Sequence, residues 1–358
     1  MSKIDSSRQF EGAFLGFAAG DAFGYPCREM SAEELRRRFE KTGCLELAVS
    51  HVTNRAMFTD ATQLTLFTSE GLIWADRVLR RDPDENINDY VFYAYQWWLY
   101  TQTKMVAGEE YAFIFEPQKA GYKSRLLKIK DLYEERAEKK KLADALMSCR
   151  DMKYGKPGQN LPRLSGDDSG GLKRVLPAGL FFNFDSEYAF QAGVDFAAIT
   201  HTSPDGYLPA GCYAAAIAEL INGATMRDAV EESLSVLRGQ TGAKKVSETI
   251  EKSLRLMDDT SVQPPDGVHD IGMGVNASEA LAIAFFCAMM FEKNYRFAVQ
   301  LAANHDGDSD VCAALTGGLI GAKYGTSAIP KKWLGKLQCT DEISEIAEDL
   351  FSITRFSE

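Results

Sequence analysis

Two short acidic clusters are the parts of this sequence best suited to chemistry: residues 59–62 (TDAT) and residues 306–310 (DGDSD). Three carboxylates within five residues, as in the second cluster, repel one another and need a compensating cation. Ligands that offer only carboxylate and hydroxyl oxygens suit Mg²⁺, Mn²⁺ or Ca²⁺ rather than zinc. The spacing differs from an EF-hand, because no Glu closes a calcium loop of the required length.

Both clusters stand where a helix is expected to begin. From Thr59 to Arg81, apolar residues recur at the three- and four-residue intervals typical of a helix. Asp60 then lies at the N-cap or in the first turn, where backbone N–H groups and the helix dipole favour a carboxylate. Acidic residues are common at helix starts without any function, so a purely structural role stays open for each cluster. The second predicted helix covers residues 308–324, and three of its residues allow close approach of another helix: Gly317, Gly318 and Gly321.

Helical periodicity dominates the rest of the chain and predicts an all-α fold. Residues 209–222 and 277–291 are expected to form mostly buried helices. No long apolar/polar alternation indicates strands. Residues 123–173 are rich in Lys and Glu and then in turn formers, which predicts a charged helix followed by a long surface loop. No internal repeat is evident, so a single domain is expected over residues 1–358.

The composition is that of a soluble globular protein, with 45% hydrophobic and 25% charged residues in a chain of 358. A formal net charge of −11 argues against binding to nucleic acid or to an anionic membrane. The N-terminal residues show no signal-peptide pattern, and no window is apolar enough for a membrane span, so a cytoplasmic location is expected. Seven scattered cysteines without a CxxC pair suggest a reducing compartment rather than a zinc ribbon or disulfide framework.

Several weaker features accompany the acidic clusters. Residues 20–26 (GDAFGYP) read as a helix end that runs into a turn, with Glu29 shortly after it. Residues 169–171 (SGG) could present backbone N–H groups to a phosphate, although such runs are usually turns. His201 and His305 lie beside predicted loops, where a lone histidine is more often structural than functional. The absence of a G-x-S-x-G elbow makes a serine hydrolase improbable.

Taken in order, six segments of the chain resemble the ADP-ribosylglycohydrolase family. They are GAFLGFAAGDAFGYP (12–26), FTDATQLTLFTSEGLI (58–73), LKRVLPAGLFF (172–182), THTSPDGYLPAGCYAAAIAELI (200–221), SEALAIAFFCAMM (278–290) and NHDGDSDVCAALTGGLIGAKYGTSAIPKKWL (304–334). The resemblance implies a compact, orthogonal all-α helical bundle with a cleft for two Mg²⁺ ions. It also implies cleavage of the glycosidic bond at ribose C1″ of ADP-ribose.

The resemblance also assigns roles to residues. It implies that Thr59 and Asp60 are the first set of metal ligands and that Asp308 and Asp310 are the second. Asp60 and Asp308 are expected to be catalytic as well, and Glu29 is expected to position or activate a water molecule. The residues expected to shape the cleft or contact the substrate are Asp21, Gly24, Ser169, Gly170, Gly171 and His201.

The chain departs from the family pattern at four places. Ala61 stands where the family usually has a second Asp, and Val311 stands where it has Thr or Ser. Arg28 occupies the usual place of an acidic residue, with Glu29 following it, and residues 137–141 (AEKKK) replace a segment that often reads APGN. Magnesium requires near-octahedral oxygen coordination, so the loss of two ligands should weaken at least one site unless water replaces them.

Two main hypotheses follow. The first is an active Mg²⁺-dependent hydrolase that removes ADP-ribose from a modified protein, with arginine as the favoured acceptor. The second is an impaired family member that binds ADP-ribose or blocks an ADP-ribosyltransferase, as an immunity protein would. A structural protein that reuses the fold is a third possibility, because fold alone does not fix function.

Overall fold

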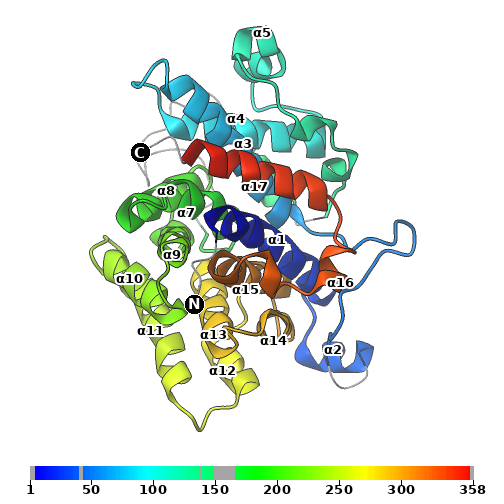
Figure 1. Cartoon of the computed structure of the whole chain (residues 1–358), viewed down its shortest axis with the longest axis vertical. Coiled ribbons are helices and arrows are strands. Elements are labelled where there is room, and N and C mark those ends of the chain that lie inside the picture. The colour runs from blue at the N-terminus through cyan, green and yellow to red at the C-terminus, as the bar shows by residue number, and fades with distance from the viewer. Residues whose placement is uncertain (1–4, 40–42, 137–138, 149–165, 355–358) are drawn as a thin grey trace.

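The computed structural model describes residues 5–39, 43–136, 139–148 and 166–354, and its helices pack in several directions around a central pair (Figure 1). Within these residues the regular elements are helical. Two isolated bridges, Ala56 with Leu337 and Asp168 with Asn276, are the strand-like pairings of the described chain. The predicted all-α fold is therefore confirmed, whereas the single domain stays a prediction. None of the described helices is long and apolar enough to cross a bilayer.

The α-helices of the first half of the chain are α1 (Ser6–Gly24), α2 (Ala32–Arg38), α3 (Asp60–Leu79), α4 (Ile87–Thr103), α5 (Pro117–Ala120), α6 (Lys139–Ser148) and α7 (Leu176–Phe181). Those of the second half are α8 (Ser186–Ala198), α9 (Pro204–Ile221), α10 (Met226–Arg238), α11 (Lys244–Asp258), α12 (Pro264–Ile271), α13 (Ala277–Met290), α14 (Tyr295–Ala303), α15 (Ser309–Tyr324), α16 (Lys331–Leu334) and α17 (Thr340–Thr354). Short 3₁₀ helices lie at Tyr25–Cys27, Glu109–Phe115, Leu126–Lys128, Lys130–Tyr133, Leu172–Arg174 and Thr326–Ala328.

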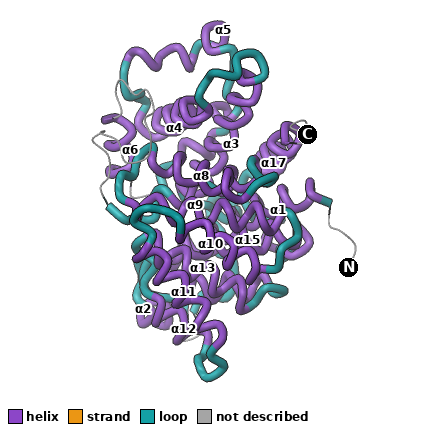
Figure 2. Tube along the Cα trace, turned by 90° about the vertical axis from the view of Figure 1, so that its left-hand side faces the viewer, coloured by secondary structure: helices purple, strands orange, loops and turns teal. Residues whose placement is uncertain are grey.

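Helices α1 and α15 form the central pair, although they come from opposite ends of the chain (Figures 1 and 2). Glycines let their backbones touch, as the sequence predicts. A Cβ atom on Gly321 would collide with the carbonyl oxygen of Gly12, and one on Gly317 would collide with that of Gly16. Gly318 faces the hydroxyl of Tyr213 on α9 instead. The start of α15 is thus fixed against the end of α1.

The two predicted helices that carry the acidic clusters begin where expected. Helix α3 begins at Asp60, and the hydroxyl of Thr59 caps it by accepting a hydrogen bond from the N–H of Ala61 at 3.2 Å. Helix α15 begins at Ser309, directly after Asp308. The predicted helices over residues 209–222 and 277–291 are also present, as the largely buried α9 and α13.

The prediction of one charged helix after residue 123 is wrong. The chain instead forms two 3₁₀ helices, and α6 begins only at Lys139. Leu126 and Leu132 are both fully buried, and residues six apart point from different faces of an α-helix. A continuous helix could not bury both against the same core. The predicted surface loop falls mainly on residues 149–165, which lie outside the described residues.

Candidate active site

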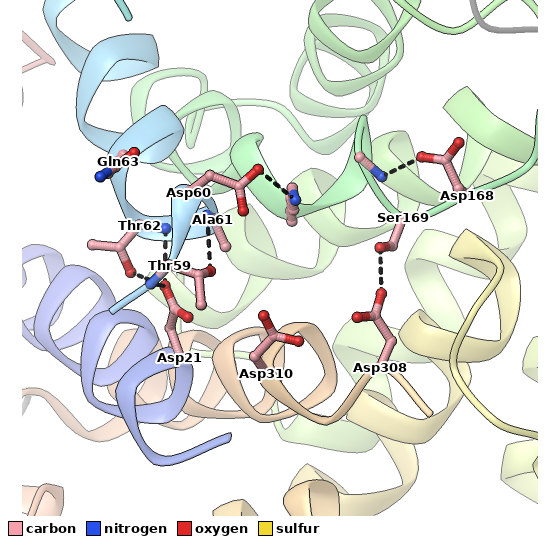
Figure 3. Close-up of polar contacts among 12 residues, drawn as sticks. Asp21, Thr59, Asp60, Ala61, Thr62, Gln63, Asp168, Ser169, Asp308 and Asp310 are labelled. Carbon is pink, nitrogen blue, oxygen red and sulfur yellow. Dashed lines mark hydrogen bonds and ion pairs between the residues drawn. The ribbon is translucent and has the colours of Figure 1, made fainter. Parts of the chain in front are cut away.

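A cavity of about 250 Å³ lies where the starts of α3 and α15 meet. Figure 3 shows Asp60 on one helix start and Asp308 and Asp310 on the other. The fold thus brings both predicted acidic clusters to one place. The predicted site residues that line the cavity are Glu29, Asp60, Ser169, Gly170, His201, Asp308 and Asp310.

At the first helix start, Asp60 forms an ion pair with a lysine. The Nζ atom of Lys173 lies 2.8 Å from Oδ2 of Asp60, and the two side chains are only 13% and 5% exposed. Burial opposes the charge on Lys173, but Asp60, together with Asp308 and Asp310, outweighs it and raises the lysine pKa. Lys173 is therefore an ammonium ion. The other oxygen of Asp60, Oδ1, is buried and has no hydrogen-bond partner in the described structure.

At the second helix start, the cations are farther from the carboxylates. Asp308 accepts a hydrogen bond from the hydroxyl of Ser169 at 2.7 Å. Arg28 approaches Asp310 to 3.8 Å, and Oδ1 of Asp310 is buried without a hydrogen-bond partner among the described residues. Burial, reinforced by the charge of Asp308, raises the pKa of Asp310 to about 7, although Arg28 and Lys173 pull it downward.

Asp21 and Thr59 lie behind the cavity rather than in its wall. The Asp21 carboxylate accepts hydrogen bonds from the backbone N–H groups of Thr59 and Thr62, each at 3.0 Å, and from the Thr62 hydroxyl. It thereby satisfies free N–H groups at the start of α3. Burial, reinforced by the charge of Asp310, raises the pKa of Asp21 to about 7. The structure thus places Asp21 as a support for α3 and outside the cavity lining, and substrate binding by Asp21 stays a prediction.

Gly24 also shapes the site from behind. A Cβ atom there would lie 2.5 Å from Cα of Asp310, so only glycine lets the end of α1 approach the start of α15 this closely. This contact agrees with the predicted role of Gly24 in forming the cleft.

The predicted phosphate-binding loop, residues 169–171, makes hydrogen bonds to other residues of the protein. The N–H of Gly170 donates to Asp168 at 3.0 Å, and Asp168 also lies 3.0 Å from Nε2 of His201. Burial lowers the pKa of His201, which favours the neutral imidazole, and its Nδ1 lies 2.9 Å from the hydroxyl of Thr200. Gly171 packs against this imidazole and does not line the cavity. His201 therefore helps to hold the loop as well as facing the cavity.

Sequence reasoning did not assign four charged residues of the cavity wall to the site: Arg28, Lys141, Asp168 and Lys173. Lys173 carried a usable signal, because Lys173 and Arg174 interrupt an otherwise apolar and glycine-rich segment. Arg174 is completely buried, and its guanidinium donates to the Thr200 hydroxyl at 2.7 Å. A pair of basic residues within an apolar segment thus marked buried cations. No comparable signal distinguished Lys141 from its charged neighbours.

Two Mg²⁺ ions do not fit the side chains as they lie. The ammonium of Lys173 already contacts Asp60, and Ala61 and Val311 contribute no oxygen at the two positions where the family pattern has ligands. In the part of the chain that the structure describes, no three His, Cys, Asp or Glu side chains converge on a point that could hold an ion. Binding of Mg²⁺ stays a prediction, but this donor set does not support the expected binuclear centre.

The fold agrees with comparisons to known proteins. A family model described as ADP-ribosylglycohydrolase matches residues 2–357, so the chain belongs to this family. A solved structure described as an ADP-ribosylglycohydrolase-related protein complex covers 99% of this chain and 100% of its own, with a TM-score of 0.61 and 19% identity. This likeness shows that the fold is shared.

Individual relatives are distant. ADP-ribosylarginine hydrolase Tri1 of Pseudomonas putida is 26% identical over 197 residues, which are 55% of this chain and 48% of the relative. ADP-ribosylhydrolase ARH3 of Danio rerio is 24% identical, over 52% of this chain and 57% of the relative. The chain thus spans about half the length of these two named relatives. An uncharacterized protein of Archaeoglobus fulgidus is 22% identical and is matched over 96% of both chains.

Proposed function

We propose that the protein hydrolyses the glycosidic bond at ribose C1″ of an ADP-ribosyl group on a protein side chain, with arginine as the acceptor. Family membership supports hydrolysis of this bond, and two of the relatives are named ADP-ribosylarginine hydrolase. The observation that carries the proposal is that Asp60, Asp308 and Asp310 come from two helix starts and line one cavity.

The buried carboxylates suit the charge that this reaction creates. Cleavage of a glycosidic bond builds positive charge on the sugar ring, and fixed negative groups in a poorly solvated site stabilise it. The Oδ1 atoms of Asp60 and Asp310 are buried and have no hydrogen-bond partner in the described structure, so no donor among the described residues offsets their charge. Asp308, held by Ser169, supplies a third carboxylate with a fixed orientation.

In this proposal Glu29 is the base that accepts a proton from water. Its side chain is 66% exposed at the cavity wall, and its N–H donates to the carbonyl of Gly307 at 3.1 Å. The backbone of Glu29 has φ of 59°, a conformation that fixes where the side chain leaves the chain. In the proposed step, the water oxygen bonds to C1″ as the bond to the arginine nitrogen breaks. Glu29 takes the water proton, and the departing nitrogen takes a proton from solvent.

Release of ADP-ribose from an arginine-ADP-ribosylated protein tests this function. The wild type should release ADP-ribose, and Asp308→Asn should reduce the rate by about 10²–10³-fold, because it removes a charge that acts in the transition state. Lys119→Met is the matched control, since Lys119 forms an ion pair with Glu116 on the exposed surface. No release by the wild type, with Mg²⁺ or with a chelator, would overturn the proposed hydrolysis.

Binding without cleavage is a second candidate function, which the Lys173–Asp60 ion pair favours. A carboxylate that is already neutralised stabilises new positive charge less well than a free one. If this candidate is correct, calorimetry will show saturable binding of ADP-ribose by a protein that releases none from the modified substrate. An ADP-ribosyltransferase as the blocked partner stays a prediction from the sequence.

A further inference from the structure

Lys173 is fixed against Asp60 by its backbone as well as by its charge. Its N–H donates to the carbonyl of Ser169 at 3.0 Å, and its own carbonyl accepts from the hydroxyl of Thr65 at 3.3 Å. Thr65 belongs to α3, the helix that begins at Asp60. The lysine is therefore tied to the helix whose first carboxylate it neutralises, and its side chain is only 13% exposed.

A divalent cation at Asp60 would have to displace this ammonium or lie next to it. In a cavity wall with little water, two neighbouring positive charges repel strongly. Displacement is also unfavourable, because a buried ammonium that loses its carboxylate loses the interaction that compensates for its desolvation. The second helix start lacks such a barrier, since Arg28 comes no nearer than 3.8 Å to Asp310 and makes no hydrogen bond with it.

We propose that the ammonium of Lys173 takes the place of a divalent cation at Asp60. The Asp60 side of the cavity is then neutralised without metal, and any divalent ion binds on the side of Asp308 and Asp310. A cation that belongs to the chain cannot be removed by a chelator. The proposal concerns cation binding and holds whether or not the protein cleaves ADP-ribose.

Calorimetric titration with MnCl₂, without any substrate, tests the proposal directly. In Lys173→Met the side chain keeps its length but loses its charge, so Mn²⁺ should bind at least about tenfold more tightly than to the wild type. The control Lys119→Met should bind Mn²⁺ as the wild type does, because its ion pair with Glu116 lies on the exposed surface. Equal Mn²⁺ affinity in the wild type and a folded Lys173→Met protein would overturn the proposal.

A second variant covers the case in which Lys173→Met does not fold. If Asp60 is not a metal ligand, Asp60→Asn should leave the Mn²⁺ affinity of the protein within about twofold of the wild-type value. A loss of about tenfold or more would show that Asp60 holds the metal, and the proposal would fail. Neither titration depends on turnover, so failure of the proposed hydrolysis would leave both results interpretable.

Discussion

The starts of α3 and α15 both bring carboxylates to the cavity, but they meet cations in different ways. At α3, Asp60 contacts the ammonium of Lys173 at 2.8 Å. At α15, Asp308 accepts a hydrogen bond from the neutral hydroxyl of Ser169, and Asp310 faces Arg28 at 3.8 Å. One helix start is therefore neutralised by a direct buried ion pair, whereas the other meets its cation, Arg28, only at a longer distance and without a hydrogen bond.

The sequence alone suggests the same role for both acidic clusters, but the structure shows that the two clusters contact different cations. Both clusters look like oxygen ligands for a pair of metal ions. The structure instead gives the first cluster a cation from its own chain and leaves the second open to an added one. The same residue types at two helix starts can therefore carry different chemistry, depending on which basic side chain the fold brings to them.

The largest expected effect comes from removing the cation at α3. Lys173→Met should lower the free energy of unfolding by about 3–5 kcal/mol at neutral pH, because it leaves the buried Asp60 carboxylate without its partner. Urea unfolding followed by circular dichroism measures the change. Adding Asp60→Asn to this variant should recover part of the loss. A loss no larger than that of the exposed control Lys119→Met, at most about 1 kcal/mol, would contradict the account.

A second buried carboxylate on α3, that of Glu70, gives the next effect. Burial raises the pKa of Glu70 from its ordinary value of 4.5 to about 7, although the Ser124 hydroxyl and the N–H of Arg125 donate to it. Between its ordinary pKa of 4.5 and about pH 7, the Glu70 carboxyl loses its proton in the unfolded chain but keeps it in the folded protein. The free energy of unfolding therefore falls as the pH rises through this range, and it is not regained above about pH 7.

Glu70→Gln should therefore reduce the loss of stability between about pH 5 and about pH 8 by about 2–3 kcal/mol. Gln keeps the shape of the side chain and can still bond to both partners, but it does not ionise. Unfolding titrations of both proteins at the two pH values provide the measurement. If the variant and the wild type lose the same stability over this range, Glu70 does not titrate as described.

A smaller effect is expected at α15. Arg28→Met should cost about 1–2 kcal/mol of unfolding free energy, less than Lys173→Met, since Arg28 makes no hydrogen bond to Asp310 and remains 15% exposed. Chemical denaturation of the two variants side by side ranks them. If Arg28→Met lowers the free energy of unfolding more than Lys173→Met does, the stronger ion pair is at α15 rather than at α3, and the account is contradicted.

Ser169→Ala should have the smallest effect, about 1 kcal/mol, because it removes one hydroxyl donor from a carboxylate that water can reach through the cavity. Thermal unfolding detects this change. A destabilisation as large as that of Lys173→Met would mean that Asp308, rather than Asp60, depends most on its partner inside the protein.

Much of the fold could be predicted from the sequence because its signals are local. The start of α3 at Thr59 and Asp60 followed from capping chemistry, and close packing of another helix against α15 followed from its glycines, although the partner, α1, did not. The charged segment after residue 123 was mispredicted, because buried Leu126 and Leu132 outweighed its helical composition. Their burial depends on the rest of the core, which local periodicity does not show.

The candidate site was predicted in part. Both acidic clusters do reach one cavity, as the resemblance implied, but the cations that face them were not assigned to it. Lys173 comes from a segment more than one hundred residues after Asp60, and only the packing of α3 against the 3₁₀ helix Leu172–Arg174 brings them together. Asp21 likewise looked available to a substrate, whereas the fold uses it to hold the start of α3.

Diffraction from crystals grown with millimolar MnCl₂, with anomalous data collected at the manganese edge, tests the central claim most directly. The account predicts that Lys173 Nζ stays within hydrogen-bond distance of Asp60, and that any manganese peak lies beside Asp308 and Asp310. A manganese peak bonded to Asp60, with the Lys173 side chain turned away from it, would contradict the account.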